Sequence, residues 1–202
     1  MKKVLAIASL IMTMAAGANA TTVNLMKGGD LDVSGGVGTF EVDGVKGTIT
    51  AHSIGSYSPR ISQGDDGIGV RSGYFDDTRD LDGFFDEWLT FGFEKAVRLV
   101  SVTMGHVDRN DDWDVYVGTT KIANESSQNP FYFGNVIAKS FSILADGHKC
   151  RDGYRRCRST DNFVIKGFEV ALAPVPLPAT GLLLIGGLAG FGLMRRRRKH
   201  AA

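Results

Sequence analysis

The chain has 202 residues, with 23 basic and 22 acidic side chains and a formal net charge of +1. Seven of the basic residues lie near the two ends, so the body between residues 21 and 174 has 16 basic and 22 acidic residues, a net charge of −6. An acidic body argues against a general nucleic-acid-binding role, because phosphate binding needs a basic face. About 150 residues are enough for one domain with a complete core.

The first twenty residues have the parts of a secretory signal peptide. Lys2 and Lys3 form a positive start, and the apolar run Val4–Ala16 follows. Ala18 and Ala20 then flank Asn19 in the small-x-small pattern of a cleavage site. The sequence therefore predicts export through the inner membrane, with signal peptidase cutting after Ala20.

The body, residues 21–174, has no long stretch of helical periodicity. Short runs of β-branched and aromatic residues recur between turn signals instead. This pattern predicts a mainly β domain, an antiparallel β-sandwich of jelly-roll type. The expected strands are Thr22–Met26, Gly38–Val42, Gly47–His52, Gly67–Arg71, Trp88–Phe93, Val97–Thr103, Trp113–Val117, Asn135–Leu144 and Phe163–Leu172.

Side-chain alternation in the middle of the chain supports this prediction. Leu89, Phe91 and Phe93 would share one face of a strand, because successive side chains point to opposite faces. Asp-Gly dipeptides are typical of tight turns. They occur at Asp43-Gly44, Asp82-Gly83, Asp146-Gly147 and Asp152-Gly153.

Cys150 and Cys157 are the two cysteines of the chain. An even pair in an exported protein predicts a disulfide bond, because the compartments outside the cytoplasm are oxidising. Six residues separate the cysteines, and this spacing does not fit a reactive CxxC motif.

A concentrated basic patch lies in and around that cysteine loop. One interpretation is a solvated loop, and the other is attraction of an anionic partner such as an acidic polysaccharide or lipid headgroups. The arginines of this patch are Arg151, Arg155, Arg156 and Arg158.

Asp108, Asn110 and Asp112 follow the D-x-N-x-D opening of an EF-hand loop. The match then ends, because Trp113 stands at the glycine position and Thr119 at the position of the bidentate glutamate. An EF-hand is therefore excluded. A calcium site on a β-sandwich loop and ordinary turn chemistry remain as alternatives, with no other cofactor expected.

Catalytic motifs are missing from the sequence. His52, His106 and His148 lie far apart, without a zinc-binding pair, and no nucleophile elbow or phosphate-binding loop occurs. We therefore expect a protein that is not an enzyme. A carbohydrate-binding module is the alternative to a structural role, with exposed aromatic rings as sugar platforms. The candidate rings are Tyr57, Tyr74, Trp88, Trp113 and Tyr132.

Residues 175–202 form a C-terminal tail of three parts. Two prolines hold residues 175–179 extended. Residues 180–194 carry no charge and would form a helix roughly 22 Å long, compared with roughly 30 Å for the hydrocarbon core. A basic block follows and should stay cytoplasmic, which predicts a single-pass transmembrane helix. The block is Arg195, Arg196, Arg197, Arg198 and Lys199.

This order of parts resembles the PEP-CTERM class of sorting signals, in its VPLPA-CTERM branch. The residues that carry the resemblance are Val175, Pro176, Leu177, Pro178 and Ala179. The resemblance implies a protein of the cell envelope or of the extracellular polysaccharide matrix. It also implies an exosortase-type membrane enzyme that reads the proline motif, and arginines that stop export.

Two other interpretations of the tail remain open. Residues 177–181 also match the LPxTG motif of Gram-positive wall proteins, which by resemblance sortase would cleave between Thr180 and Gly181. A plain membrane anchor that nothing cleaves is the second. The sequence predicts, in sum, an exported envelope or matrix protein with a non-catalytic surface role.

Overall fold

The structure, a computed structural model, describes residues 19–54, 58–73, 79–83, 86–145 and 161–173. The described part is mainly β, as predicted, and all of its strand pairs are antiparallel. Its strands are β1 (Ala20–Asn24), β2 (Leu31–Ser34), β3 (Val37–Val42), β4 (Val45–Ser53), β5 (Arg60–Gly64), β6 (Gly67–Arg71), β7 (Leu81–Asp82), β8 (Glu87–Gly105), β9 (Trp113–Val117), β10 (Thr120–Ser126), β11 (Phe131–Tyr132), β12 (Ile137–Ala145) and β13 (Asn162–Leu172).

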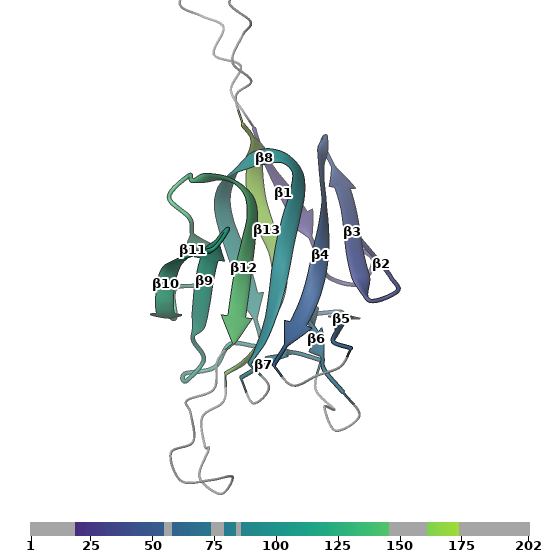
Figure 1. Cartoon of the computed structure of the whole chain (residues 1–202), viewed down its shortest axis with the longest axis vertical. Coiled ribbons are helices and arrows are strands. Elements are labelled where there is room, and N and C mark those ends of the chain that lie inside the picture. The colour runs from purple at the N-terminus through teal and green to yellow at the C-terminus, as the bar shows by residue number, and fades with distance from the viewer. Residues whose placement is uncertain (1–18, 55–57, 74–78, 84–85, 146–160, 174–202) are drawn as a thin grey trace, which may run out of the picture.

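Strand β8 is the longest element and organises the sheet. Its first half, residues 87–93, pairs with β4 on one side and with β12 on the other. Its second half, residues 97–105, pairs with β13 and with the short β11. The β8 ribbon arches over one end of the domain between the two halves (Figure 1). One strand therefore joins two layers of the fold.

The continuity of β8 corrects the prediction of two separate strands, Trp88–Phe93 and Val97–Thr103. Glu94 and Lys95, between them, are exposed and resemble a loop in the sequence. In the structure they lie where the strand bends, and its pairing with β12 shifts register nearby. A bend of this kind lets the chain change layer without ending the strand.

The two layers face each other across an aromatic core. We call β2, β3, β4, the first half of β8, β12, β9 and β10 the front layer. The back layer comprises the second half of β8, β13 and β1 (Figure 1). Phe168 of the back layer packs edge-on against Phe91 and Phe141 of the front layer, at ring-centre distances of 5.4 and 5.8 Å. The inward alternation predicted for Leu89, Phe91 and Phe93 is confirmed, because all three are buried.

The hairpin between β3 and β4 turns at the predicted Asp43-Gly44 dipeptide. Both residues have positive φ, 49° and 80°. A two-residue hairpin turn of this kind matches the twist of the flanking strands and favours glycine at such positions. The turn leaves Val42 opposite Val45 and so fixes the register of the hairpin.

The first and last described strands run side by side. Ala20 is the partner of Ala171 and Val23 is the partner of Phe168 in the β1–β13 ladder. The start of β1 and the end of β13 therefore meet at one pole of the domain, the upper pole in Figure 1. Ser53, Glu87 and Ala145 align at the ends of β4, β8 and β12 and mark the opposite pole.

Candidate functional site

Several of the predicted sites lie outside the described residues. Among the residues that the structure describes, no helix is long and apolar enough to cross a membrane. The predictions that lie outside concern Ala18 of the signal cleavage site, the disulfide Cys150–Cys157, the patch Arg151, Arg155, Arg156 and Arg158, the motif 175–179, the helix 180–194 and the basic block 195–199.

The predicted calcium loop is held together by carboxylates that accept backbone hydrogen bonds. The backbone N–H of Asn110 donates to Oδ1 of Asp108 at 3.2 Å, as in a common turn. Asp111, which the sequence analysis did not select, is 3 % exposed. Its two carboxylate oxygens accept the N–H groups of Asp108, at 2.6 Å, and Asn162, at 3.0 Å. Asp111 therefore ties this loop to the start of β13.

The neighbouring acidic groups also have protein partners. The N–H of Asp112 donates to Oδ1 of Asp161 at 3.1 Å. Asp114 is fully buried, accepts the N–H of Glu125 at 3.1 Å and contacts the Nζ of Lys121. The hydrogen bond to Asp114 raises the pKa of Lys121 above its usual value. Among the described residues no three acidic, histidine or cysteine side chains are grouped as metal ligands. Calcium binding stays a prediction.

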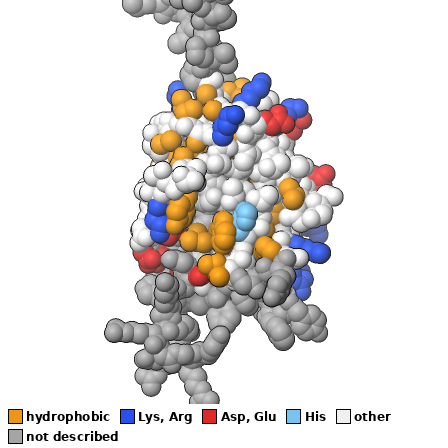
Figure 2. All heavy atoms as spheres, viewed as in Figure 1, with side chains coloured by type: hydrophobic (Ala, Val, Ile, Leu, Met, Phe, Trp, Pro, Cys, Tyr) orange, Lys and Arg blue, Asp and Glu red, His pale blue; other side chains and the backbone are white. Residues whose placement is uncertain are grey.

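The outer face of the front layer carries a row of polar side chains. Thr50, Thr90, Ser142, Tyr116 and Lys121 are successive cross-strand partners on β4, β8, β12, β9 and β10. The hydroxyls of Thr90 and Ser142 hydrogen-bond at 3.0 Å, and the Nζ of Lys121 lies 5.3 Å from the ring centre of Tyr116. We call these five residues the polar row. Figure 2 shows the molecule from this side.

Trp88 and His52 form a stacked pair beside the polar row. Their ring centres are 4.9 Å apart and their planes differ by 8°. The hydroxyl of Thr50 lies 3.0 Å from Nε2 of His52 and fixes the imidazole ring. Burial lowers the pKa of His52 below its usual value and so favours the uncharged imidazole. Neither ring is fully exposed or fully buried, which leaves part of the indole surface open to a ligand.

The other aromatic residues predicted as sugar platforms differ from Trp88 in their exposure. Trp113 is completely buried and packs edge-on against Phe163 at 5.4 Å, so the prediction of a sugar platform is wrong for this residue. The residue type alone does not show that the Trp113 side chain points into the core. Tyr132 is 57 % exposed, and Tyr57 and Tyr74 lie outside the described residues.

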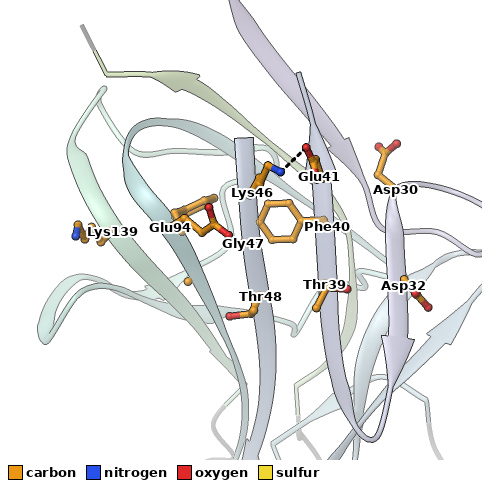
Figure 3. Close-up of a pocket in the computed structure, with 12 residues that line it drawn as sticks. Asp30, Asp32, Thr39, Phe40, Glu41, Lys46, Gly47, Thr48, Glu94 and Lys139 are labelled. Atoms are coloured by element: carbon orange, nitrogen blue, oxygen red, sulfur yellow. Dashed lines mark ion pairs between the residues drawn. The ribbon is translucent and has the colours of Figure 1, made fainter. Parts of the chain in front are cut away.

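A hollow of about 660 Å³ crosses β2, β3, β4 and β8 at the edge of the front layer (Figure 3). Glu41 and Lys46 point toward each other there, with Oε1 and Nζ 2.6 Å apart. This hydrogen bond raises the pKa of Lys46. Phe40 forms an apolar part of the wall, and the remaining charged side chains carry both signs. Those charged side chains are Asp30, Asp32, Glu94 and Lys139. The described residues that line this hollow include no histidine, serine or cysteine nucleophile.

His106 contacts two acidic residues, Asp66 and Asp80, that lie far from it in the sequence. Its Nε2 lies 3.0 Å from Oδ2 of Asp66, and its Nδ1 lies 3.6 Å from Oδ1 of Asp80. These contacts connect the end of β8 to the β5–β6 turn and to the segment before β7. No local sequence pattern predicts this cluster, because its three members come from different parts of the chain.

No protein-family model matches the chain, and no curated protein and no solved structure is significantly similar to it. The function proposed for this chain therefore depends on its own residues and geometry.

Proposed function

We propose that this chain is an exported protein of the cell envelope or extracellular matrix, delivered by a C-terminal exosortase-type sorting signal and acting without catalysis. The observation that supports this proposal best is the pairing of Thr21 with Val170, which brings both ends of the domain to one pole and is kept after cleavage. A tail inserted in the membrane would hold that pole toward the lipid. The opposite pole, with Ser53, Glu87 and Ala145, would face outward.

We also propose a β-sandwich topology for the domain and a helix at each end of the precursor. The two facing layers and their antiparallel strands fit a jelly-roll-like β-sandwich. A signal helix would precede the sandwich, and a single transmembrane helix over residues 180–194 would follow it. Signal peptidase and an exosortase-type enzyme are the expected processing partners, and the membrane-bound form is an intermediate.

The position of the predicted cleavage site sets the order of events. Residue Thr21 is 6 % exposed and pairs with Val170 in the β1–β13 ladder. A peptidase needs an extended, accessible peptide, and the bond between Ala20 and Thr21 lies within β1. Cleavage after Ala20 must therefore come before β1 pairs with β13.

N-terminal sequencing of the chain from the envelope fraction tests the export step. We expect Thr21 as the first residue of the mature protein, since removal of residues 1–20 accompanies export. An Ala18→Arg plus Ala20→Arg variant is the matched control, because large charged side chains do not fit the small-x-small pattern, and it should retain Met1. Met1 on the wild-type protein, found in the soluble cell fraction, would contradict the proposal.

Carbohydrate binding is the second candidate, and the Trp88–His52 stack beside the polar row favours it. A partly open indole offers an apolar platform for a sugar ring, and adjacent hydroxyls offer hydrogen bonds. On a glycan array, Trp88→Ala should weaken binding by about tenfold or more, which corresponds to about 1.4 kcal/mol.

Two comparisons make that glycan test decisive. Tyr132→Ala removes an exposed ring away from the stack and should leave binding unchanged. Running the array with calcium and with a chelator tests the Asp108, Asn110 and Asp112 prediction, because a ligand site held by calcium loses affinity when the ion is removed. Equal glycan binding by wild type and Trp88→Ala would exclude the platform.

A further inference from the structure

A basic groove of about 760 Å³ lies along the β5–β6 hairpin. Four cationic side chains line it, and all four residues are exposed. The described residues that line the groove include no carboxylate, although the body of the chain has a net charge of −6. The four cations are Lys27, Arg60, Arg71 and Arg79.

Strand pairing brings two of these cations together. Arg60 on β5 and Arg71 on β6 are direct cross-strand partners, so their side chains share one face of the hairpin. Like charges in directly opposite positions destabilise a strand pair. The pair therefore has a cost in the free protein that an anion would remove.

Local packing adds the other two cations. The N–H of Val70 donates to the carbonyl oxygen of Asp80 at 3.2 Å, which places Arg79 beside β6. Gly69 permits this approach, because a Cβ there would clash with the Arg79 carbonyl oxygen. The N–H of Lys27 donates to the carbonyl oxygen of Gly64 at 2.8 Å and fixes the residue at the end of β5.

Gln63 secures the loop that carries Lys27. Its Nε2 donates to the carbonyl oxygens of Leu25 at 3.1 Å and Met26 at 3.2 Å. The groove is thus built from strands and a tethered loop. Rigid placement of this kind lowers the entropy that must be lost when a ligand binds.

The cations of the groove lack acidic partners within the described part of the chain. The ion pairs between described residues use Lys46, His106 and Lys121 as cations. Lys27, Arg60, Arg71 and Arg79 take part in none of them. Four cationic side chains on one groove, none of them in an ion pair with a described acidic residue, attract anions and concentrate them locally.

We propose that the basic groove binds an acidic polysaccharide through its uronic-acid carboxylates. An arginine guanidinium matches a carboxylate with two parallel hydrogen bonds, and the groove offers three such groups. Ser62 adds a hydroxyl that can bond to sugar oxygens. The open shape of the groove suits a chain that passes through it.

The same observations argue against a nucleic acid. Single-stranded nucleic-acid sites use aromatic rings on which bases stack. The described residues that line the groove include no aromatic ring. This inference depends on neither end of the chain, so it goes beyond the proposed export and sorting and can fail separately from them.

The test measures binding of oligogalacturonate to the purified full-length protein in detergent. We expect Arg60→Ser plus Arg71→Ser to weaken binding by about tenfold, and added salt to weaken wild-type binding, because exposed charges are screened within about 8 Å at physiological ionic strength. Arg155→Ser plus Arg156→Ser removes the same charge from the cysteine loop and should leave binding unchanged. The melting temperature of the Arg60 and Arg71 variant should equal or exceed that of wild type.

Any of the following results would overturn the proposed binding site. They are no binding by wild type, equal binding by the Arg60 and Arg71 variant, loss of binding in the Arg155 and Arg156 variant instead, and tighter binding of oligothymidylate or of anionic lipid vesicles than of oligogalacturonate. Neutral dextran serves as the uncharged control, and equal affinity for it would also contradict a carboxylate site.

Discussion

Replacing Phe168 by alanine should lower the free energy of unfolding by about 3–5 kcal/mol. Phe168 is 2 % exposed and is the back-layer ring of the aromatic core. Its ring contacts those of four front-layer residues, Phe40, Phe91, Phe93 and Phe141. Truncation therefore removes buried apolar surface and leaves a cavity between the two layers. Because β8 belongs to both layers, they cannot move together freely to fill that cavity.

Thermal denaturation measures this effect. A loss of about 3–5 kcal/mol corresponds to a fall of roughly 6–20 °C in the melting temperature of a domain of this size. Tyr132→Ala is the control, because that ring is 57 % exposed and surface substitutions usually change stability by less than about 0.5 kcal/mol. Ordinary surface substitutions change the melting temperature by up to about 2 °C. If the melting temperature of Phe168→Ala also lies within about 2 °C of the wild-type value, the two layers are not packed through this ring.

The second large effect concerns the proline motif of the tail. Pro176→Ala plus Pro178→Ala should leave membrane insertion intact and block removal of the tail. An anchor needs only apolar length and cytoplasmic charge, so it is indifferent to the residues before the helix. A sorting signal must fit an enzyme, and the two prolines hold it extended. The uncut precursor should then accumulate in the inner membrane.

Neutral replacements of residues 195–199 provide a contrast to the proline variant. They remove the positive charge that keeps the end of the chain cytoplasmic, so they should weaken retention rather than processing. Normal tail removal in the proline double variant would contradict recognition of the motif.

Local side-chain patterns predicted several of the strands correctly. The runs Gly67–Arg71 and Trp113–Val117 coincide with β6 and β9, and the alternation of Leu89, Phe91 and Phe93 gave the inward face of β8. These strands are readable because one face is apolar or the whole run is buried.

Polar or very short strands could not be read in the same way. Strand β10 is exposed or partly exposed throughout, β7 and β11 have two residues each, and β2 follows a turn-rich stretch. Their strand conformation comes from pairing with neighbours that are distant in sequence or from hairpin geometry. Tertiary pairing of this kind outweighs local propensity.

For the candidate sites too, groups of sequence neighbours could be predicted and groups of residues distant in sequence could not. The motif of Asp108, Asn110 and Asp112 is visible in the local sequence. The role of Asp111, a buried carboxylate beside it that accepts two backbone hydrogen bonds, is not. The basic patch visible in the sequence is a cluster of neighbours, whereas the basic groove joins Lys27, Arg60, Arg71 and Arg79 through strand register. Residues separated in this way can be recognised as one group only when the fold is known.

The most direct test of the central proposal is the intact mass of the mature protein isolated from the envelope or the medium. The proposed sorting predicts a C-terminus at or close to residues 175–179, with the helix and the basic block removed. Cleavage after Thr180 would favour a sortase instead. A mature protein that retains Ala202, with no shorter form, would contradict exosortase-type processing and leave the tail as a simple membrane anchor.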